Sequence, residues 1–416
     1  MPPSNLSRRG LLGLGMAGLV APRFGYAEPV AGVNRRFLFV HCRGGWDTTY
    51  VFQPNFGSSI VDMEPNSTLN TSHSIPFVDN ASRPNVPRFF AQYGDRTCVV
   101  NGIEVRSVTH ERCARIMMTG SAEGNTDDWG AILAGRAESR QLLPYFVLSG
   151  TAFTAQYSSR VVRVGASGQL EALISGEILE QATERFPVPS SGRDALVDAV
   201  VRRRMTEKAS GNAVVTAAAS ALDDVASLEA YASRLQISGY EPGGCYGLAN
   251  QMAAVFDVFE LGLARTALVE YRGWCSEGWD THADNVRQGL HFDELFEYLA
   301  KALADLDGRT AVDGGALADE TVVVVLSEMG RTPQLNGGGG RDHWTFTSAM
   351  VIGPGVAGGR VVGGFDDSGY GAATDFASGD VMAEGPGISA ANFGATLMAL
   401  GDVDPGETLP VTAVLA

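Results

Sequence analysis

Residues 321–332 read TVVVVLSEMGRT, and this stretch decides the fold class. Its first six residues form an apolar run without alternating polar side chains, which predicts a strand buried on both faces. Such strands belong to mostly parallel sheets that helices cover on both sides. A serine, a glutamate and an arginine follow the run within five residues. The same stretch therefore places polar side chains just beyond the end of a buried strand.

Other short apolar runs lie on either side of this stretch, at residues 36–41, 97–102, 145–148, 266–271 and 348–352. Segments that indicate helices lie between them, at 89–93, 110–118, 128–137, 250–261 and 292–306. Strands that alternate with helices predict a doubly wound α/β fold with a mostly parallel sheet. Residues from about 151 to 245 interrupt the alternation. Because residues 190–238 are Ala-rich, charged and nearly free of Gly and Pro, we expect a helical insertion or cap there.

The composition excludes several classes of protein. The chain has 416 residues, a formal net charge of −16, 45% hydrophobic residues and 19% charged residues. These values are too apolar for a disordered chain. An acidic surface repels phosphate backbones, so we expect no nucleic-acid partner. The length suits one large α/β domain or two smaller ones, and we place one α/β domain at residues 28–416.

The N-terminal 27 residues have the pattern of an export signal. Residues 7–13 carry paired arginines, residues 14–20 are weakly apolar, and small residues lead to Ala27. The pair resembles the twin-arginine signal, which implies the twin-arginine export machinery as a partner and a periplasmic or extracellular location. The apolar run is too short and Gly-rich to span a bilayer, and we expect no stable membrane span elsewhere.

The five cysteines have no CxxC spacing, which excludes a zinc ribbon. An oxidising compartment permits a disulfide, and the odd count leaves at least one free thiol.

Candidate functional side chains gather just after the predicted strands. In open parallel sheets, ligands bind beyond the carboxyl ends of the strands. Six residues fall in such positions: Asp47, His110, Asp280, His282, Glu328 and His343. Imidazoles with carboxylates suit Zn²⁺, Mn²⁺ or Fe, whereas carboxylates alone suit Mg²⁺ or Ca²⁺. Asp342, next to His343, is a ligand itself or orients its neighbour. We therefore predict one shared polar site, although each residue alone also has a structural explanation, such as an aspartate that caps a helix.

The other three histidines receive no such role. His41, at the end of the first strand, and His291, on a helix, are expected to be structural, and His73 lies in a polar loop and is expected to face solvent.

Several motifs together resemble domain-of-unknown-function family 1501, which is grouped with the alkaline phosphatase and sulfatase superfamily. These motifs are RGGWD at 43–47, GWDTH at 278–282, SEMGRTP at 327–333, Asp342-His343 and GGRV at 358–361. The resemblance implies an alkaline phosphatase-like fold and a metal-dependent hydrolase of phosphate or sulfate esters, with a divalent cation such as Zn²⁺, Mn²⁺ or Mg²⁺.

The resemblance also implies roles for individual residues. Asp47 matches the first metal aspartate, Asp280 and His282 resemble an Asp/His ligand pair, Glu328 takes the place of the acid after the late strand, and His343 resembles the last histidine. Thr109, or less favourably Ser107, stands where the nucleophile is expected. Arg43 or Arg331 would clamp the oxyanion, and the alternative for both is a surface or interdomain ion pair.

Three hypotheses remain open from the sequence. The first is the metal-dependent esterase just described, and the second is a non-catalytic binding or assembly protein for a polysaccharide or a co-exported partner. Met329 favours the second, since it is apolar where a ligand is expected. The third is a structural protein whose Asp and His side chains only hydrogen-bond the loops. Cys113 lacks the sulfatase signature around it, which disfavours a formylglycine sulfatase.

Overall fold

The computed structural model describes residues 35–137, 139, 141–164 and 247–416, together with short parts of 177–231. The chain divides into two compact units, one made of residues 1–27 and 163–239 and the other of residues 28–162 and 240–416. The predicted signal at 1–27 lies outside the described residues and stays a prediction. All the predicted site residues belong to the second unit.

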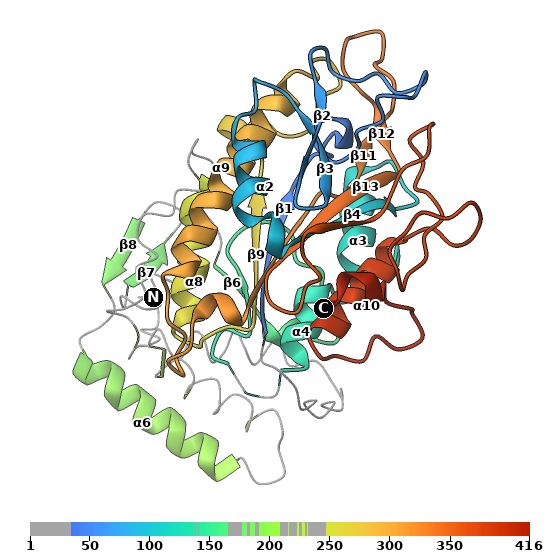
Figure 1. The fold of residues 1–416 in the computed structure, drawn as a ribbon. Coiled ribbons are helices and arrows are strands. Elements are labelled where there is room, and N and C mark those ends of the chain that lie inside the picture. The colour runs from blue at the N-terminus through green and yellow to red at the C-terminus, as the bar shows by residue number, and fades with distance from the viewer. Residues whose placement is uncertain are drawn as a thin grey trace. The chain divides into compact units, whose positions relative to one another are not determined.

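An eight-stranded sheet forms the centre of the second unit (Figure 1). In spatial order its strands are β14 (Arg360–Gly363), β4 (Thr97–Glu104), β13 (Phe346–Ile352), β10 (Thr321–Leu326), β1 (Arg36–Cys42), β9 (Thr266–Tyr271), β5 (Tyr145–Val147) and β6 (Val161–Arg163). β1 pairs in parallel with β10 and β9, as do β5 with β9 and β14 with β4. The expected mostly parallel α/β sheet is confirmed.

β13 is antiparallel to its neighbours, so its amino end, and not its carboxyl end, lies nearest to the site. It is antiparallel to both β10 and β4, and its first residue, Phe346, pairs with Glu104, the last residue of β4. The amino end of β13 therefore lies at the edge where the parallel strands have their carboxyl ends. His343, three residues before β13, reaches the site for this reason.

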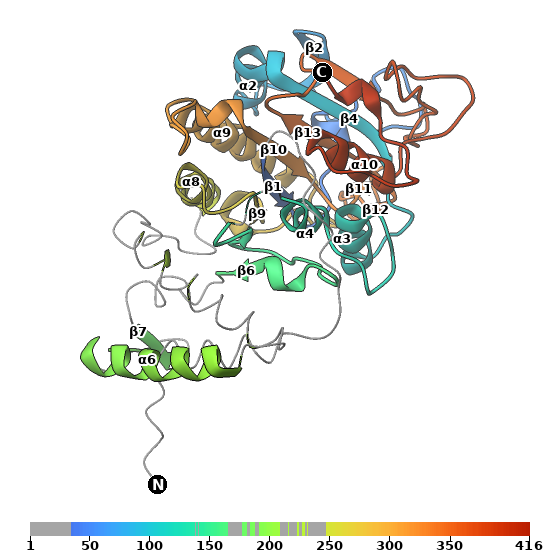
Figure 2. The same ribbon diagram turned by 90° about the horizontal axis from the view of Figure 1, so that it is seen from below.

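Helices cover both faces of the sheet (Figure 2). On one face α2 (Asn85–Tyr93) and α8 (Gly247–Glu260) pack against α9 (Arg287–Asp307), and on the other α10 (Ala390–Leu400) packs against α3 (His110–Thr119) and α4 (Trp129–Gly135). The five predicted helices are present with shifted ends, and α10 was not predicted. Within residues 35–137 and 247–416, two antiparallel pairs lie outside the large sheet: β2 (Thr68–Ser72) with β3 (Ile75–Asp79), and β11 (Gly330–Arg331) with β12 (His343–Trp344).

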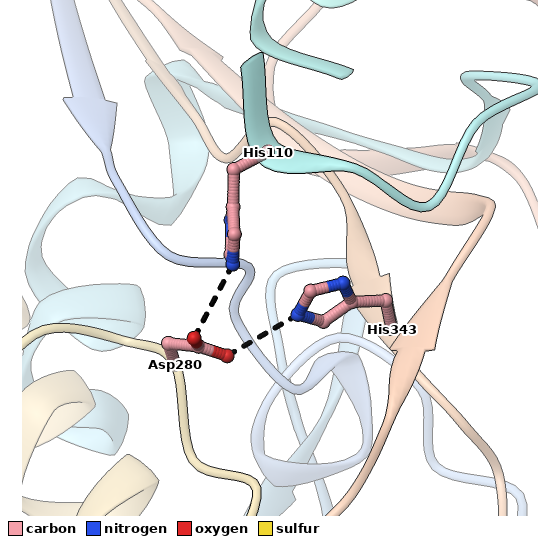
Figure 3. Close-up of side chains that lie close together, drawn as sticks. All are labelled: His110, Asp280 and His343. Atoms are coloured by element: carbon pink, nitrogen blue, oxygen red, sulfur yellow. Dashed lines mark hydrogen bonds and ion pairs between the residues drawn. The ribbon is translucent and has the colours of Figure 1, made fainter. Parts of the chain in front are cut away.

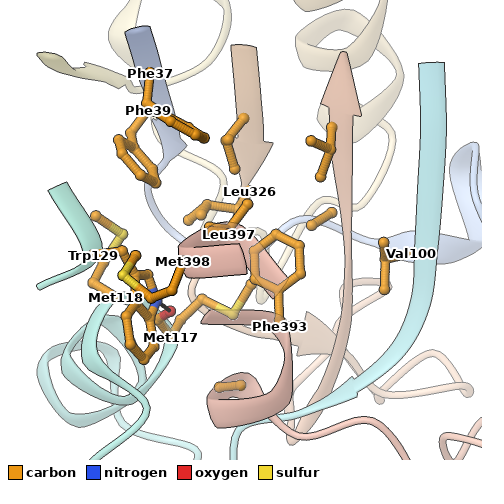
Figure 4. Packing of buried hydrophobic residues seen from close by; sticks show 14 of the residues in the cluster. Phe37, Phe39, Val100, Met117, Met118, Trp129, Leu326, Phe393, Leu397 and Met398 are labelled. Carbon is orange, nitrogen blue, oxygen red and sulfur yellow. Dashed lines mark hydrogen bonds between the residues drawn. The ribbon is translucent and has the colours of Figure 1, made fainter. Parts of the chain in front are cut away.

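The apolar runs are buried on both faces, as their lack of alternation predicts. Every residue of β1 and of β10 is buried. On the α3, α4 and α10 face, the core combines strand residues with helix residues such as Phe37, Phe39, Leu326, Trp129 and Leu397 (Figure 4). On the α9 face, Trp46 from one site loop stacks on Phe292 with ring centroids 5.8 Å apart, and Trp279 from another packs edge to face on Phe292 at 4.8 Å. Burial of each such ring contributes about 2 kcal/mol and fixes its loop on the sheet.

The predicted helical insertion at about 151–245 falls largely outside the described residues. Its described part contains α6 (Ser191–Lys208) and the antiparallel pair of β7 (Glu177–Glu180) and β8 (Glu184–Pro187). In the part of the chain that the structure describes, no helix is both long and apolar enough to cross a membrane. Cys42, Cys98 and Cys113 are buried free thiols, and Cys275 is disulfide-bonded.

The packing of α10 on α4 gives a stability test. A Cβ at Gly394 would lie 2.0 Å from Cζ2 of Trp129, whose Nε1 donates to the carbonyl of Met117 at 2.9 Å. Helix propensity alone favours alanine by about 1 kcal/mol. Because the ring is held in place, we expect Gly394→Ala to lower the free energy of unfolding by about 1–3 kcal/mol, measured with urea. Ala399→Gly, on the same helix, is the control for helix propensity, and a stabilised Gly394→Ala protein would contradict the packing described.

Candidate metal centre

Three side chains from distant parts of the chain meet at the carboxyl edge of the sheet (Figure 3). His110 begins α3 after β4, Asp280 follows β9, and His343 lies in β12. Their ligand atoms all lie within 4.8 Å of one another. Asp280 is central, since its Oδ2 is 3.3 Å from Nε2 of His110 and its Oδ1 is 3.3 Å from Nε2 of His343. The structure therefore brings together three residues that the sequence pointed to separately.

His282 joins this group from the solvent side. Its Nε2 is 3.1 Å from Oδ1 of Asp280 and 2.9 Å from Nε2 of His343. Its side chain is 45% exposed, against 26% for His110 and 18% for His343. Four predicted site residues thus converge, with His282 at the open side of the group.

The other ring nitrogen of each imidazole faces an acceptor. Nδ1 of His110 lies 2.9 Å from Oε1 of Glu328, Nδ1 of His282 lies 3.1 Å from Oδ1 of Asp342, and Nδ1 of His343 lies 2.6 Å from the carbonyl of Val108. Carboxylate and carbonyl oxygens only accept, so we assign the proton to Nδ1 in all three rings. In the neutral imidazole the lone pair is then on Nε2, the nitrogen that faces Asp280. Histidines that bind metals are usually oriented in this way.

Three of these acceptor atoms lie so close together that a positive charge must lie between them. Nε2 of His282, Nε2 of His343 and Oδ1 of Asp280 form a triangle with sides of 2.9, 3.1 and 3.3 Å. Lone pairs at these distances repel unless a proton or a cation lies among them. An ion about 2.1 Å from two ligand atoms holds them about 3.0 Å apart at a right angle and about 3.4 Å apart at the tetrahedral angle. The observed side chains therefore fit a divalent cation.

The charges of the group are strongly coupled. Hydrogen bonds with Asp280 and Glu328 raise the pKa of His110 to about 9. Partial burial alone would raise the pKa of Asp280, but hydrogen bonds from His110 and Arg331 outweigh it and hold that pKa well below its usual range. Asn336 and His282 likewise lower the pKa of the exposed Asp342. Asp280 and Asp342 are therefore ionised at neutral pH, and without a metal ion protonated His110 offsets part of their charge.

Asp47 lies apart from the converging group. It is fully buried, and its Oδ1 accepts from the backbone N–H of Thr49 at 2.9 Å and from the Thr49 hydroxyl at 2.7 Å, so it caps the short 3₁₀ helix η1 (Thr48–Tyr50). Its Oδ2 accepts from Nδ2 of Asn285 at 2.7 Å and pairs with Nε of Arg341 at 2.9 Å. Both carboxylate oxygens are thus occupied by protein groups, and Asp47 joins the first site loop to buried Arg341.

The two arginines proposed as oxyanion clamps lie in different surroundings. Arg331 is 2% exposed, and its Nη2 donates to Oδ1 of Asp280 at 2.7 Å. Its other hydrogen bonds go to the backbone carbonyls of Gly44, Gly45, Trp279 and Arg341. Arg43 is 45% exposed, with Nη1 3.6 Å from Oε2 of Glu270. Arg331 thus supports Asp280 from the protein interior, whereas the guanidinium of Arg43 is open to solvent.

The two candidate nucleophiles lie on the segment just before α3. Thr109 is exposed and directly precedes α3, and its hydroxyl is 3.5 Å from that of Ser107. Val108, between them, holds His343 through its carbonyl, and His110 follows. Arg106, just before this segment, has a φ of 53°, a left-handed conformation that is strained for a side chain of its size. Both hydroxyls are therefore carried on the segment that also positions His110 and His343.

Sequence reasoning missed the residues that fasten the loops together. Gln288 on α9 is fully buried, and its Nε2 donates to the carbonyl of Trp279 at 2.8 Å while its Oε1 accepts from the N–H of Asp47 at 2.9 Å. Asn336 donates to the carbonyl of His282 at 2.9 Å. Neither residue is of a type that marks a site, and no motif in the sequence points to them.

Comparison with known proteins places the chain in a family. The sequence model of the family described as "Protein of unknown function (DUF1501)" matches residues 34–385. The chain belongs to this family. The resemblance stated from the motifs is thereby confirmed, and no curated protein sequence matches.

Several solved structures are similar to this member of the family. They include Ps i-CgsB in complex with k-i-k-neocarrahexaose, which is 11% identical with a TM-score of 0.41 over 91% of this chain and 75% of that one. Lipoteichoic acid synthase LtaP from Listeria monocytogenes is 10% identical with a TM-score of 0.40, over 96% and 80%. A protein in the alkaline phosphatase superfamily from Vibrio parahaemolyticus is 10% identical with a TM-score of 0.39, over 98% and 79%.

The turn at Gly44 offers a test of how the loops meet. Gly44 has a φ of +128°, and a Cβ there would lie 2.7 Å from the backbone nitrogen of Trp279 and 2.8 Å from that of Asp280. Gly278 has a φ of +85° but open space around its Cβ position. Gly278→Ala therefore carries only conformational strain of about 1–3 kcal/mol. We expect Gly44→Ala to lower the free energy of unfolding by at least about 2 kcal/mol more, measured by urea titration, because backbone must move. Equal losses would show that the close approach is unimportant.

The raised pKa of His110 predicts how the stability of the metal-free protein depends on pH. Stabilisation from a raised histidine pKa is complete below its ordinary value of about 6.5 and is lost as pH rises through about 9. The lowered pKa of Asp280 acts in the opposite sense, since its contribution is present above about 4 and is lost in acid. Urea unfolding after chelation should therefore show a decline in stability between pH 6.5 and 9. His110→Gln should flatten that decline, and an unchanged slope in the variant would contradict the assignment.

Proposed function

We propose that the chain is an exported, metal-dependent hydrolase of phosphate or sulfate esters, with its cation held by His110, Asp280, His282 and His343. The observation that carries the proposal is the triangle of two Nε2 atoms and one carboxylate oxygen, with sides of 2.9–3.3 Å. Both imidazoles of the triangle have Nδ1 bound to an acceptor, so their lone pairs point at one another. A cation relieves that repulsion.

The donor set narrows the choice of metal. Three imidazoles and one carboxylate favour Zn²⁺ or Mn²⁺ over Mg²⁺, which prefers oxygen ligands and keeps several waters. When bound, such a cation polarises an ester oxygen and stabilises the charge that develops on the transferred group.

The chain's own residues supply the rest of the proposed mechanism. Arg331 holds the carboxylate of Asp280 in place through a hydrogen bond of 2.7 Å. Thr109, exposed and next to His110 in the chain, presents a hydroxyl for attack on phosphorus or sulfur. The bond from Oγ forms, the bond to the ester oxygen breaks, and the hydroxyl proton goes to the leaving alcohol. Water then cleaves the threonine ester, which releases phosphate or sulfate and restores Thr109. Ser107 is the second choice for this role. Arg43 is the exposed cation that we assign to the anionic group of the substrate, because the N–H groups of Arg331 are directed to protein atoms.

Export is part of the proposal, and the arginine pair, weakly apolar run and small residues of positions 7–27 support it. The twin-arginine machinery would then be a partner, and the periplasm or the extracellular space the location. Proteins exported by this route usually cross already folded, so a metal centre assembled inside the cell is compatible with it.

A non-catalytic protein that binds a polysaccharide or a co-exported partner is the alternative function. Met329 favoured it in the sequence, but this side chain is fully buried in the hydrophobic core on the α3, α4 and α10 face. Its apolar character thus has a packing explanation. The exposed position of His282 and Asp342 suits a binding protein as well as an enzyme, so turnover must decide between the two.

Metal content and turnover test the proposal together. We expect one Zn²⁺ or Mn²⁺ per chain by mass spectrometry, and hydrolysis of aryl phosphate, aryl sulfate or bis-aryl phosphate that chelation abolishes and metal restores. Asp280→Ala and His343→Ala should lose the metal, because each removes a ligand. Thr109→Ala should keep the metal and lose at least about 100-fold in kcat. His73→Ala, on an exposed loop, is the control.

The outcomes separate the hypotheses. Metal without turnover of any of these esters would favour the binding protein. A folded wild-type chain that binds neither Zn²⁺ nor Mn²⁺ would contradict the hydrolase and the binding protein. The structural protein would then be the remaining hypothesis.

A further inference from the structure

We infer that Glu328 is a positioning residue for His110 and is not itself a ligand of the cation. The inference rests on the proposed metal centre and assigns a role to an acidic residue that borders it on the side of the sheet. Glu328 follows β10 by two residues and has no exposed surface.

The contacts of Glu328 leave no place for an ion. Its Oε1 accepts from the backbone N–H of Gly44 at 2.8 Å and lies 2.9 Å from Nδ1 of His110. Its Oε2 lies 3.1 Å from the same Gly44 nitrogen and 3.3 Å from Nε2 of His41. A carboxylate has about four acceptor positions. Here Oε1 faces two protein groups and Oε2 faces three, because the hydroxyl of Ser327 also donates to Oε2 at 3.2 Å.

The imidazole ring of His110 separates Glu328 from the cation position. Nδ1 of His110 faces Glu328, whereas Nε2 faces Oδ2 of Asp280 at 3.3 Å. These two nitrogens lie on opposite sides of the ring and point away from each other. An ion bound through Nε2 is therefore on the far side of the ring from Glu328.

Burial makes this support rigid. An isolated carboxylate in a protein interior costs several kcal/mol, so it persists only where donors surround it. Glu328 has Gly44 and two imidazoles around it, and burial, which alone would raise its pKa, is outweighed by His110 and His41, which keep it ionised. His41 is 4% exposed in β1 and is thus part of the support.

The three imidazoles differ in how firmly they are held. His282 is oriented by Asp342, a carboxylate with 61% exposure, and His343 by a neutral backbone carbonyl. His110 alone faces a buried, ionised carboxylate. Its orientation should therefore be the most strongly fixed and its Nε2 the most basic.

Glu328→Gln tests the inference with little change in shape. The amide is a weaker acceptor, so we expect the variant to bind one Co²⁺ per chain with an affinity about 10- to 100-fold lower, measured by competition with a chelator. The visible absorption bands of bound Co²⁺ should keep their positions, because the ligands are unchanged. Asp342→Asn, which weakens the exposed support of His282, is the matched control and should cost less than about 10-fold.

Two results would overturn the inference. Shifted Co²⁺ bands in Glu328→Gln would mean that Glu328 is a ligand, and unchanged affinity would mean that it does not position His110.

A nuclear magnetic resonance measurement keeps the inference testable if the wild-type chain binds no ion or the variant does not fold. In protein labelled with ¹⁵N-histidine, the wild type should show a deshielded proton on Nδ1 of His110, the signature of a hydrogen bond to a carboxylate. Folded Glu328→Gln should lose it. Its absence from the wild type would contradict the role of Glu328, whereas missing metal alone would contradict only the proposed function.

Discussion

One buried guanidinium holds the candidate site together. Arg331 donates to the carboxylate of Asp280 and to four backbone carbonyls, which belong to the loops after β1 and β9 and to the segment before β12. A buried cation is tolerated only when its N–H groups are bonded, so these loops are fixed relative to one another through a single side chain. Arg341, whose carbonyl is one of the four, extends the network to Asp47. The converging imidazoles therefore depend on a framework that contains no imidazole.

The strand pattern predicted the sheet because buried parallel strands leave a clear mark in sequence. The run at 321–326 became β10, beside β1, and the run at 266–271 became β9 with the same bounds. The rule that ligands gather beyond the carboxyl ends of parallel strands also located Asp280 and His110 correctly. His343 reaches the same edge for another reason, since β13 is antiparallel and the residue precedes it. Nothing in residues 346–352 reveals the direction of that strand.

Residue type alone did not reveal which acids face the cluster. Asp47 follows Gly-Gly-Trp and Asp280 follows Gly-Trp, each in the loop after a strand, yet only Asp280 faces the imidazoles. Asp47 instead caps η1 and pairs with Arg341. The difference depends on how loops far apart in sequence contact each other. Buried Gln288 helps to fix these loops, because it bonds to the backbone of both Asp47 and Trp279. A single sequence does not reveal such contacts. The sequence pattern therefore placed Asp47 and Asp280 in one site, although the fold separates them.

The residues that orient the cluster are buried on one side and exposed on the other. This difference affects how a substrate would reach the cluster. Glu328 and Arg331 are buried and hold His110 and Asp280 from the side of the sheet. His282 and Asp342 are 45% and 61% exposed on the other side. His282 is nonetheless held in place, because a Cβ at Gly340 would lie 2.1 Å from its carbonyl carbon, so the glycine loop packs directly on its backbone. Under the proposed function, a substrate would therefore approach from the exposed side that contains His282, while the buried residues keep His110 and Asp280 in place.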